Sequence, residues 1–266
     1  MRSKPIVIIT LALSVLGAAL QLWCQRTAFD PGANLPLIGA PALTVLIIFA
    51  IAVPIVALAV SLPLQGIKPQ GDNSLYHIMG TPGRVVGILS GAAFLAGGML
   101  LLIESVPPLL RRPNTLEVTT CLVDLLLMAG GAAMIILSLS GQEARFHVRH
   151  SLWPLLPGFA GCFWLVIYYH SNSRDAVVLR YCWILLCLMA AILAFYYQAG
   201  FAFDRVRPLR AQTFSMAGAI YAFTAIPAAD TLSEVILLLG VGGWMLLHCR
   251  LIPRRSEIHG HREKRE

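Results

Sequence analysis

Asp124 is the residue of this sequence best placed to do chemistry, because it is an acid inside an otherwise apolar run from Val118 to Leu139. That run is long enough to cross a bilayer. A carboxylate in the hydrocarbon region costs roughly 2.5–3.5 kcal/mol on insertion scales, so it is expected to face protein or water and to have a partner. Two interpretations follow. Asp124 either belongs to a site for an ion or small molecule, or it makes a single buried pair or hydrogen bond.

Three other ionisable residues stand at the ends of apolar runs. Glu104 ends the third run, Arg180 begins the sixth and Glu234 begins the eighth. The functional hypothesis places all four in an outward-facing polar vestibule, with Asp124 as its deepest group and Arg180 as a candidate counter-ion. The alternative is that Glu104, Arg180 and Glu234 are ordinary interfacial residues. The ligand-binding hypothesis therefore rests on Asp124, Glu104, Arg180 and Glu234.

The composition indicates which elements position these residues. Hydrophobic residues make up 58% of the 266 and charged residues 12%, whereas about a quarter of a soluble domain is charged. The sequence therefore predicts an all-α, polytopic integral membrane protein whose partner is the lipid bilayer. The net charge of +7 does not indicate nucleic-acid binding, because most of the basic residues lie in short loops and at the C-terminus.

The apolar runs predict about eight transmembrane helices in one domain, residues 1–250, followed by a short charged tail, residues 251–266. The first run resembles a signal peptide in its basic start, but it is long and lacks a small-residue cleavage site, which favours an uncleaved span. Prolines 107, 108 and 113 are expected to break the chain between the third and fourth spans. The predicted spans are residues 5–24, 42–62, 85–103, 118–139, 152–169, 177–199, 211–226 and 232–249.

Loop charge predicts the orientation of these spans. With the N-terminus in the cytoplasm, the inner segments carry 15 lysines and arginines and the outer connections carry five. Because cytoplasmic loops are enriched in lysine and arginine, this bias predicts that both termini are cytoplasmic, with the plasma membrane as the location. In that orientation Asp124, Glu104, Arg180 and Glu234 all lie toward the outer face.

Small residues on the third span predict its neighbour. Small residues fall near one face of this helix, namely Gly87, Ser90, Gly91, Gly97 and Gly98, and Gly130 and Gly131 lie on the fourth span. Small residues let helix backbones approach closely in a membrane. We therefore expect the third and fourth spans to form an antiparallel hairpin.

Polar residues near the cytoplasmic side have less definite roles. The aromatic-rich segment 195–204 is typical of an interfacial belt, and the alternative is a ligand platform with Gln198 as its polar contact. His248 is interpreted as a snorkelling residue at a helix end. The six cysteines form no CxxC pair, so we expect them to be core residues.

Motifs of known chemistry are missing from the sequence. It contains no HExxH metal helix and no GxxxxGK[ST] phosphate loop. Haem between spans would need facing histidines at matched depth, but His170 and His248 are expected at opposite faces. No cofactor, no metal and no catalytic residue is therefore predicted.

The last third of the chain contains segments that resemble those of other membrane proteins. From Gly161 to Trp244, its Cys-Phe-Trp-Leu, Tyr-Tyr-Gln-Ala-Gly-Phe-Ala-Phe and Leu-Ser-Glu segments resemble a family of multi-pass membrane proteins from anaerobic Gram-positive bacteria. No activity is assigned to that family, so the resemblance implies a multi-pass fold and nothing about a substrate.

Three functions are compatible with the sequence. The first is a non-enzymatic membrane protein of scaffold, sensor or accessory type, and this interpretation is favoured. The second is a small-molecule or ion permease that uses the vestibule around Asp124. The third is a membrane enzyme acting on a lipid or isoprenoid, which would need a second catalytic group near Asp124.

Overall fold

The computed structural model describes residues 3–29, 37, 39–65, 79–111, 114–140, 153–172, 178–201 and 207–262. These residues form eight α-helices and two short 3-10 helices, η1 (Leu62–Leu64) and η4 (Ile226–Ala228), and no strand occurs among them. The prediction of an all-α protein is confirmed. The α-helices are α1 (Ser3–Thr27), α2 (Pro41–Ser61), α3 (Thr81–Arg111), α4 (Thr115–Ser140), α5 (Leu155–Asn172), α6 (Val178–Ala199), α7 (Pro208–Ala225) and α8 (Leu232–Arg262).

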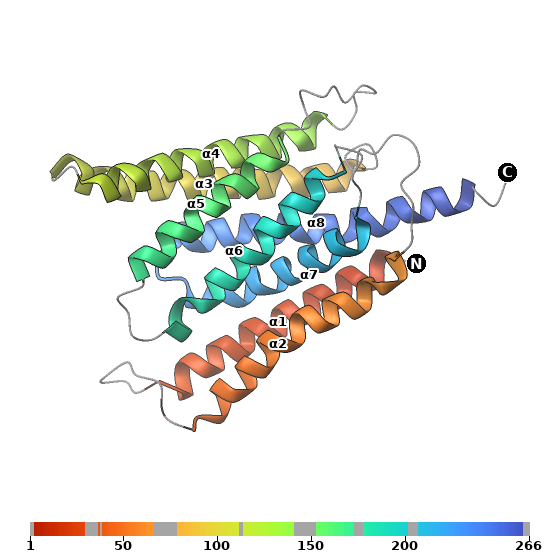
Figure 1. Cartoon of the computed structure of the whole chain (residues 1–266), viewed down its shortest axis with the longest axis horizontal. Helices are drawn as coiled ribbons and strands as arrows, with labels where there is room; N and C mark the ends of the chain where they lie inside the picture. Colours follow the sequence, from red (N-terminus) through yellow and green to blue (C-terminus); the bar gives the residue numbers. More distant parts are fainter. Residues whose placement is uncertain are drawn as a thin grey trace.

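The helices form a bundle in which successive helices run in opposite directions, so both ends of the chain lie at the same end of the bundle (Figure 1). Helices α1 and α2 pack on one side of α7, which also contacts α6 and α8. Helix α8 contacts α3, which pairs with α4, and α5 joins α4 to α6. We call the end that carries the two termini the terminal end, and the other the acidic end because Asp124, Glu104 and Glu234 lie there.

Helix α7 is the central element of the bundle. Thirteen of its 18 residues are buried, and it packs against α1, α2, α6 and α8. It is rich in alanine, glycine, serine and threonine, which let neighbouring backbones approach closely. The helix begins at Pro208, three residues before the span predicted there, because proline is readily accommodated in the first turn of a helix.

Six helices of the described chain are long and apolar enough to cross a membrane, namely α1, α2, α3, α4, α6 and α8. The most apolar of them, α2, has only 22% of its best apolar window buried, whereas 67% is buried in the less apolar α8. A soluble protein would bury its most apolar helix most deeply. The reverse order fits a bundle whose outer helices contact lipid.

Exposed aliphatic and aromatic side chains point to the same environment. They occur along the length of α1, α2, α3 and α4 and continue onto α5, α6 and the start of α8, whereas the apolar patches of a soluble monomer are usually limited to a few hundred Å². Those at least three-fifths exposed are Ile8, Val15, Ile48, Ile51, Ile55, Leu89, Leu110, Leu122, Leu139, Phe159, Val166, Leu232 and Tyr196.

The predicted glycine-rich hairpin is confirmed. A Cβ added at Gly131 of α4 would lie 2.5 Å from the backbone nitrogen of Leu95 of α3, and one added at Gly98 would lie 3.0 Å from the nitrogen of Met128. The residue numbers rise along α3 as they fall along α4, so the two helices are antiparallel. The interface brings backbone against backbone along much of its length.

A second close interface joins α3 to α8. A Cβ added at Gly240 of α8 would lie 2.8 Å from the backbone nitrogen of Phe94, and one added at Gly97 would lie 2.5 Å from Leu237. The small residues of α3 are recognisable in the sequence, but their packing against α8 is not. Helix α3 is therefore packed between α4 and α8.

Two helices continue through prolines and past their predicted ends. Helix α3 does not break at Pro107 and Pro108 but continues through them to Arg111, while Pro113 lies outside the described residues. Helix α8 continues through Pro253 to Arg262, into the predicted tail. Proline removes a backbone hydrogen bond but need not end a membrane helix, because neighbouring groups can satisfy the freed carbonyls.

Candidate functional site

Asp124 lies on the face of α4 that packs against α3. Its side chain is only 3% exposed, and its Oδ2 accepts a hydrogen bond of 2.7 Å from the hydroxyl of Ser105 on α3. The thiol of Cys121, one turn earlier on α4, donates to the Ser105 oxygen at 3.4 Å. The expectation that Asp124 faces protein and has a partner is confirmed, and that partner is a serine.

Glu104, the residue before Ser105, faces α8. Its side chain is exposed, and both carboxylate oxygens lie 3.1 Å from the hydroxyl of Ser233, which is fully buried on α8. The Ser233 oxygen in turn lies 2.7 Å from that of Thr231. The adjacent residues Glu104 and Ser105 thus connect α3 to two different helices.

Glu234 caps the N-terminus of α8. Its backbone N–H donates to Oγ1 of Thr231 at 3.3 Å, and its Oε2 accepts the backbone N–H of Asp230 at 3.0 Å. A threonine or serine followed three residues later by glutamate is the sequence signature of a capping box. Thr231-Leu-Ser-Glu234 carries this signature, which could have revealed the role of Glu234 from the sequence.

The three acids gather at the acidic end of the bundle. Glu104 is near enough to interact electrostatically with both Asp124 and Glu234. The structure therefore brings together three of the four residues of the ligand-binding hypothesis. The side chain of Arg180, the fourth, lies outside the described part of the chain, so its role as a counter-ion stays a prediction.

The chemistry of this cluster is that of carboxylates bound to neutral donors. A hydrogen bond to a charged group contributes about 1.5–3 kcal/mol to stability. Each of the three carboxylates accepts such a bond from a hydroxyl or a backbone N–H of this chain. In the part of the chain that the structure describes, no group of three His, Cys, Asp or Glu residues is arranged to hold a metal ion.

A second polar cluster lies in the terminal half of the bundle. Trp244 Nε1 donates to Gln198 Oε1 at 3.2 Å, and Gln198 Nε2 donates to Ser215 at 3.0 Å. All three side chains are buried. This network joins α6, α7 and α8, and it could not be predicted from the sequence because its members are far apart in the chain.

The structure contradicts two interpretations of polar residues, the ligand platform at Gln198 and the snorkelling of His248. Gln198 does not face a ligand platform at the membrane surface, because its amide is buried within the helix bundle. His248 does not snorkel: it is fully buried, its Nδ1 lies 3.0 Å from the Trp244 carbonyl, and its ring packs against the Trp244 ring. Both residues lie inside the bundle rather than at the membrane surface.

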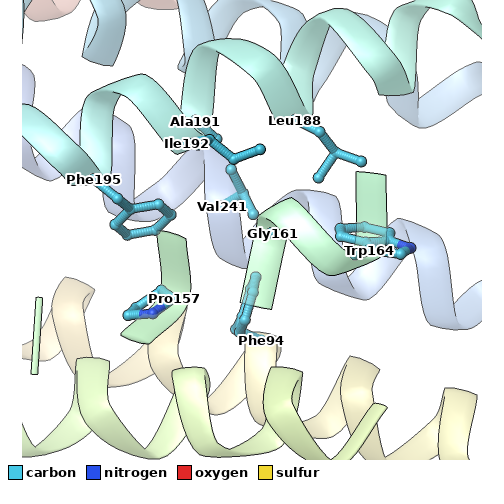
Figure 2. Close-up of a pocket in the computed structure, with 9 residues that line it drawn as sticks. All are labelled: Phe94, Pro157, Gly161, Trp164, Leu188, Ala191, Ile192, Phe195 and Val241. Atoms are coloured by element: carbon cyan, nitrogen blue, oxygen red, sulfur yellow. The ribbon is translucent and has the colours of Figure 1, made fainter. Parts of the chain in front are cut away.

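A small apolar hollow lies between α3, α5, α6 and α8 (Figure 2). Phe94 of α3, Pro157 and Trp164 of α5, and Leu188 and Phe195 of α6 line it. None of the three acids lines this hollow, so it is separate from the site predicted from the sequence.

The chain matches no protein-family model, no curated protein and no solved structure. The fold and the exposed apolar helices define it as a helical protein suited to a membrane, and the resemblance described above stays a prediction.

Proposed function

We propose that this chain is an eight-span integral protein of the plasma membrane that acts without catalysis, as a scaffold, sensor or accessory protein. The observation that supports this function best is the hydrogen bonding of its buried and half-buried acids and of Glu104. Asp124, Glu104 and Glu234 each accept a hydrogen bond that holds helices together or caps a helix. Acids that accept such hydrogen bonds stabilise the packing of the helices.

The proposal of eight spans rests on α5 and α7, in addition to the six more apolar helices. Each has 18 residues and is therefore roughly 27 Å long, against a hydrocarbon core of about 30 Å. Helix α7 is less apolar than a lipid-facing span because it is surrounded by four other helices. The alternation of direction in Figure 1 also requires both helices to run from one end of the bundle to the other.

Charge supports an orientation with both termini in the cytoplasm. Five of the six lysines and arginines whose side chains are described lie at the terminal end, and all five such acids lie toward the acidic end. Membrane proteins place an excess of lysine and arginine in the cytoplasm. The basic residues at the terminal end are Lys4, Arg84, Arg207, Arg210 and Arg250, and the exception is Arg26.

An epitope inserted after Gly39 is expected to bind antibody on intact cells, whereas a C-terminal epitope is expected to bind only after permeabilisation. Gly39 is exposed between α1 and α2 and has a φ of 82°, so it lies in a turn at the outer end. Each epitope is placed in a separate variant, so that antibody binding to one variant can be compared with binding to the other. Binding of the C-terminal epitope on intact cells would overturn the orientation.

Asp124→Asn is expected to leave the thermal stability of the purified protein unchanged or higher. Asparagine keeps an oxygen that accepts the Ser105 hydroxyl, and it removes a buried charge. Asp124→Ala serves as the comparison, because it removes the acceptor and is expected to cost about 1–3 kcal/mol. A large loss of stability in Asp124→Asn would show that the charge itself, with a cationic partner, holds the helices together.

A permease with a vestibule at the acidic end is the second candidate. It is favoured by Glu104, which is exposed and interacts with both buried or half-buried acids, Asp124 and Glu234. A screen of metal cations and small organic cations by thermal shift separates the two candidates. A shift that is present in the wild type and absent in Asp124→Asn would support the permease and overturn the scaffold.

A further inference from the structure

The end of α3 contains a stretch of weakened helix. Pro107 and Pro108 lie inside the helix, and proline has no N–H to donate to the carbonyl four residues earlier. The carbonyls of Ile103 and Glu104 therefore lack their usual helical partners. Two consecutive losses leave this part of α3 with less internal support than the rest of the helix.

The packing of α3 against its neighbours is also weaker after Gly98. The glycine contacts that hold α3 against α4 extend from Gly87 to Gly98 and do not continue to the end of α3. After them, Ile103 and Leu110 are exposed, Leu110 to 79%. In Figure 1 this end of the α3–α4 pair extends past the corresponding ends of the other helices.

Two side-chain hydrogen bonds hold the weakened stretch. Ser105 donates to Asp124 of α4 at 2.7 Å, and Glu104 accepts from Ser233 of α8 at 3.1 Å. Both bonds arise within three residues of the proline pair. Each bond involves a carboxylate, either Asp124 or Glu104. Loss of either bond would therefore weaken the hold on the turn of α3 that lacks backbone hydrogen bonds.

We propose that the outer end of α3, residues 103–111, is a hinged segment that opens at the turn before Pro107 and Pro108, where the carbonyls of Ile103 and Glu104 lack helical donors, and is held closed by these two serine–carboxylate hydrogen bonds. In the closed state the segment continues the axis of α3 along α4. In the open state both bonds are broken and the segment moves away from α4 and α8, while the glycine interfaces remain intact. This conformational device goes beyond the proposed scaffold function and does not depend on it.

In the variant Ser105→Cys, oxidation is expected to lock the segment closed and reduction is expected to release it. The Ser105 oxygen lies 3.4 Å from the thiol of Cys121, so a thiol at position 105 would face the thiol of Cys121 across the α3–α4 interface. Ferricyanide oxidation is expected to join residues 105 and 121, which proteolysis and mass spectrometry detect. Dithiothreitol is expected to release the segment, because a thiol is a weaker donor to Asp124 than a hydroxyl.

Amide hydrogen exchange of the full chain in nanodiscs tests the hinge. The double variant Ser105→Ala, Ser233→Ala is expected to raise exchange in residues 103–111 at least tenfold over the wild type, with no change in the middle of α4 or α8. Oxidised Ser105→Cys is expected to exchange no faster than the wild type there. Reduced Ser105→Cys is expected to exchange faster.

Ser138→Ala is the matched control. Ser138 is buried in the same α3–α4 interface, but its hydroxyl bonds to the Met134 carbonyl of its own helix, so exchange in residues 103–111 should not change. The proposal is overturned if the double variant exchanges like the wild type in that segment. It is also overturned if exchange rises equally throughout α3, α4 and α8, or if Ser105→Cys with its disulfide to Cys121 confirmed exchanges as fast in residues 103–111 as the reduced variant.

Discussion

Gly131→Ala is expected to lower the free energy of unfolding by about 1–3 kcal/mol, and Gly131→Leu is expected to prevent the α3–α4 pair from closing. A Cβ at position 131 would lie 2.5 Å from the backbone nitrogen of Leu95 and 2.8 Å from its Cα. These are main-chain atoms, so the clash cannot be relieved by turning a side chain. The two helices would have to separate along their whole interface. Thermal unfolding of the purified protein in detergent measures the loss.

Gly218→Ala is the matched control for this prediction. Gly218 is also buried and helical, but its added Cβ would lie 3.4 Å from the side chain of Met245, which is ordinary contact. Alanine is favoured over glycine within a helix by up to about 1 kcal/mol. Gly218→Ala should therefore be neutral or stabilising. Equal stability of Gly131→Ala and the wild type would contradict the close α3–α4 interface.

Trp244→Ala is expected to destabilise the protein by about 3–5 kcal/mol. Trp244 is 1% exposed, and its side chain lies where α8 approaches Gln198 of α6. Its loss also removes the donor for Gln198 Oε1. Equilibrium unfolding in mixed micelles, followed by circular dichroism, gives the change in free energy.

Trp244→Phe separates the two contributions. Phenylalanine keeps most of the apolar volume but lacks the indole N–H, so it leaves Gln198 Oε1 buried without that donor, at a cost of about 1–3 kcal/mol. In a Gln198→Met background the same substitution should cost less, because no amide oxygen then needs a partner. An equal cost in both backgrounds would show that the hydrogen bond contributes nothing.

The α3–α4 hairpin could be predicted from the sequence because its cause is local. Gly91, Gly98 and Gly131 lie at helical spacing on two successive helices, and small residues at such spacing permit close approach whatever surrounds them. The all-helical class followed from the length of the apolar runs for a similar reason. In a membrane, backbone groups must be satisfied within the segment, so a long apolar run forms a helix.

The hydropathy of a segment, however, did not reveal where it sits in the bundle. Helix α7 is less apolar than most of the others yet is highly enclosed, because its neighbours are α1, α2, α6 and α8 rather than lipid. The interpretation of His248 as a snorkelling residue, and the alternative that placed Gln198 on a ligand platform, were wrong for the same reason. A polar residue near the end of an apolar run can reach either the membrane surface or a buried partner, and only the packing of distant helices decides which.

Asp124 could be predicted to need a partner from its position alone, because an unpaired carboxylate is unstable in an apolar helix. That the partner is Ser105, that Glu104 meets Ser233 of α8, and that Glu234 caps its own helix became apparent from the packing of the helices. The difference lies in the range of the interactions. Burial and helix formation act over a few turns, whereas the pairing of hydroxyls with carboxylates depends on which helices become neighbours.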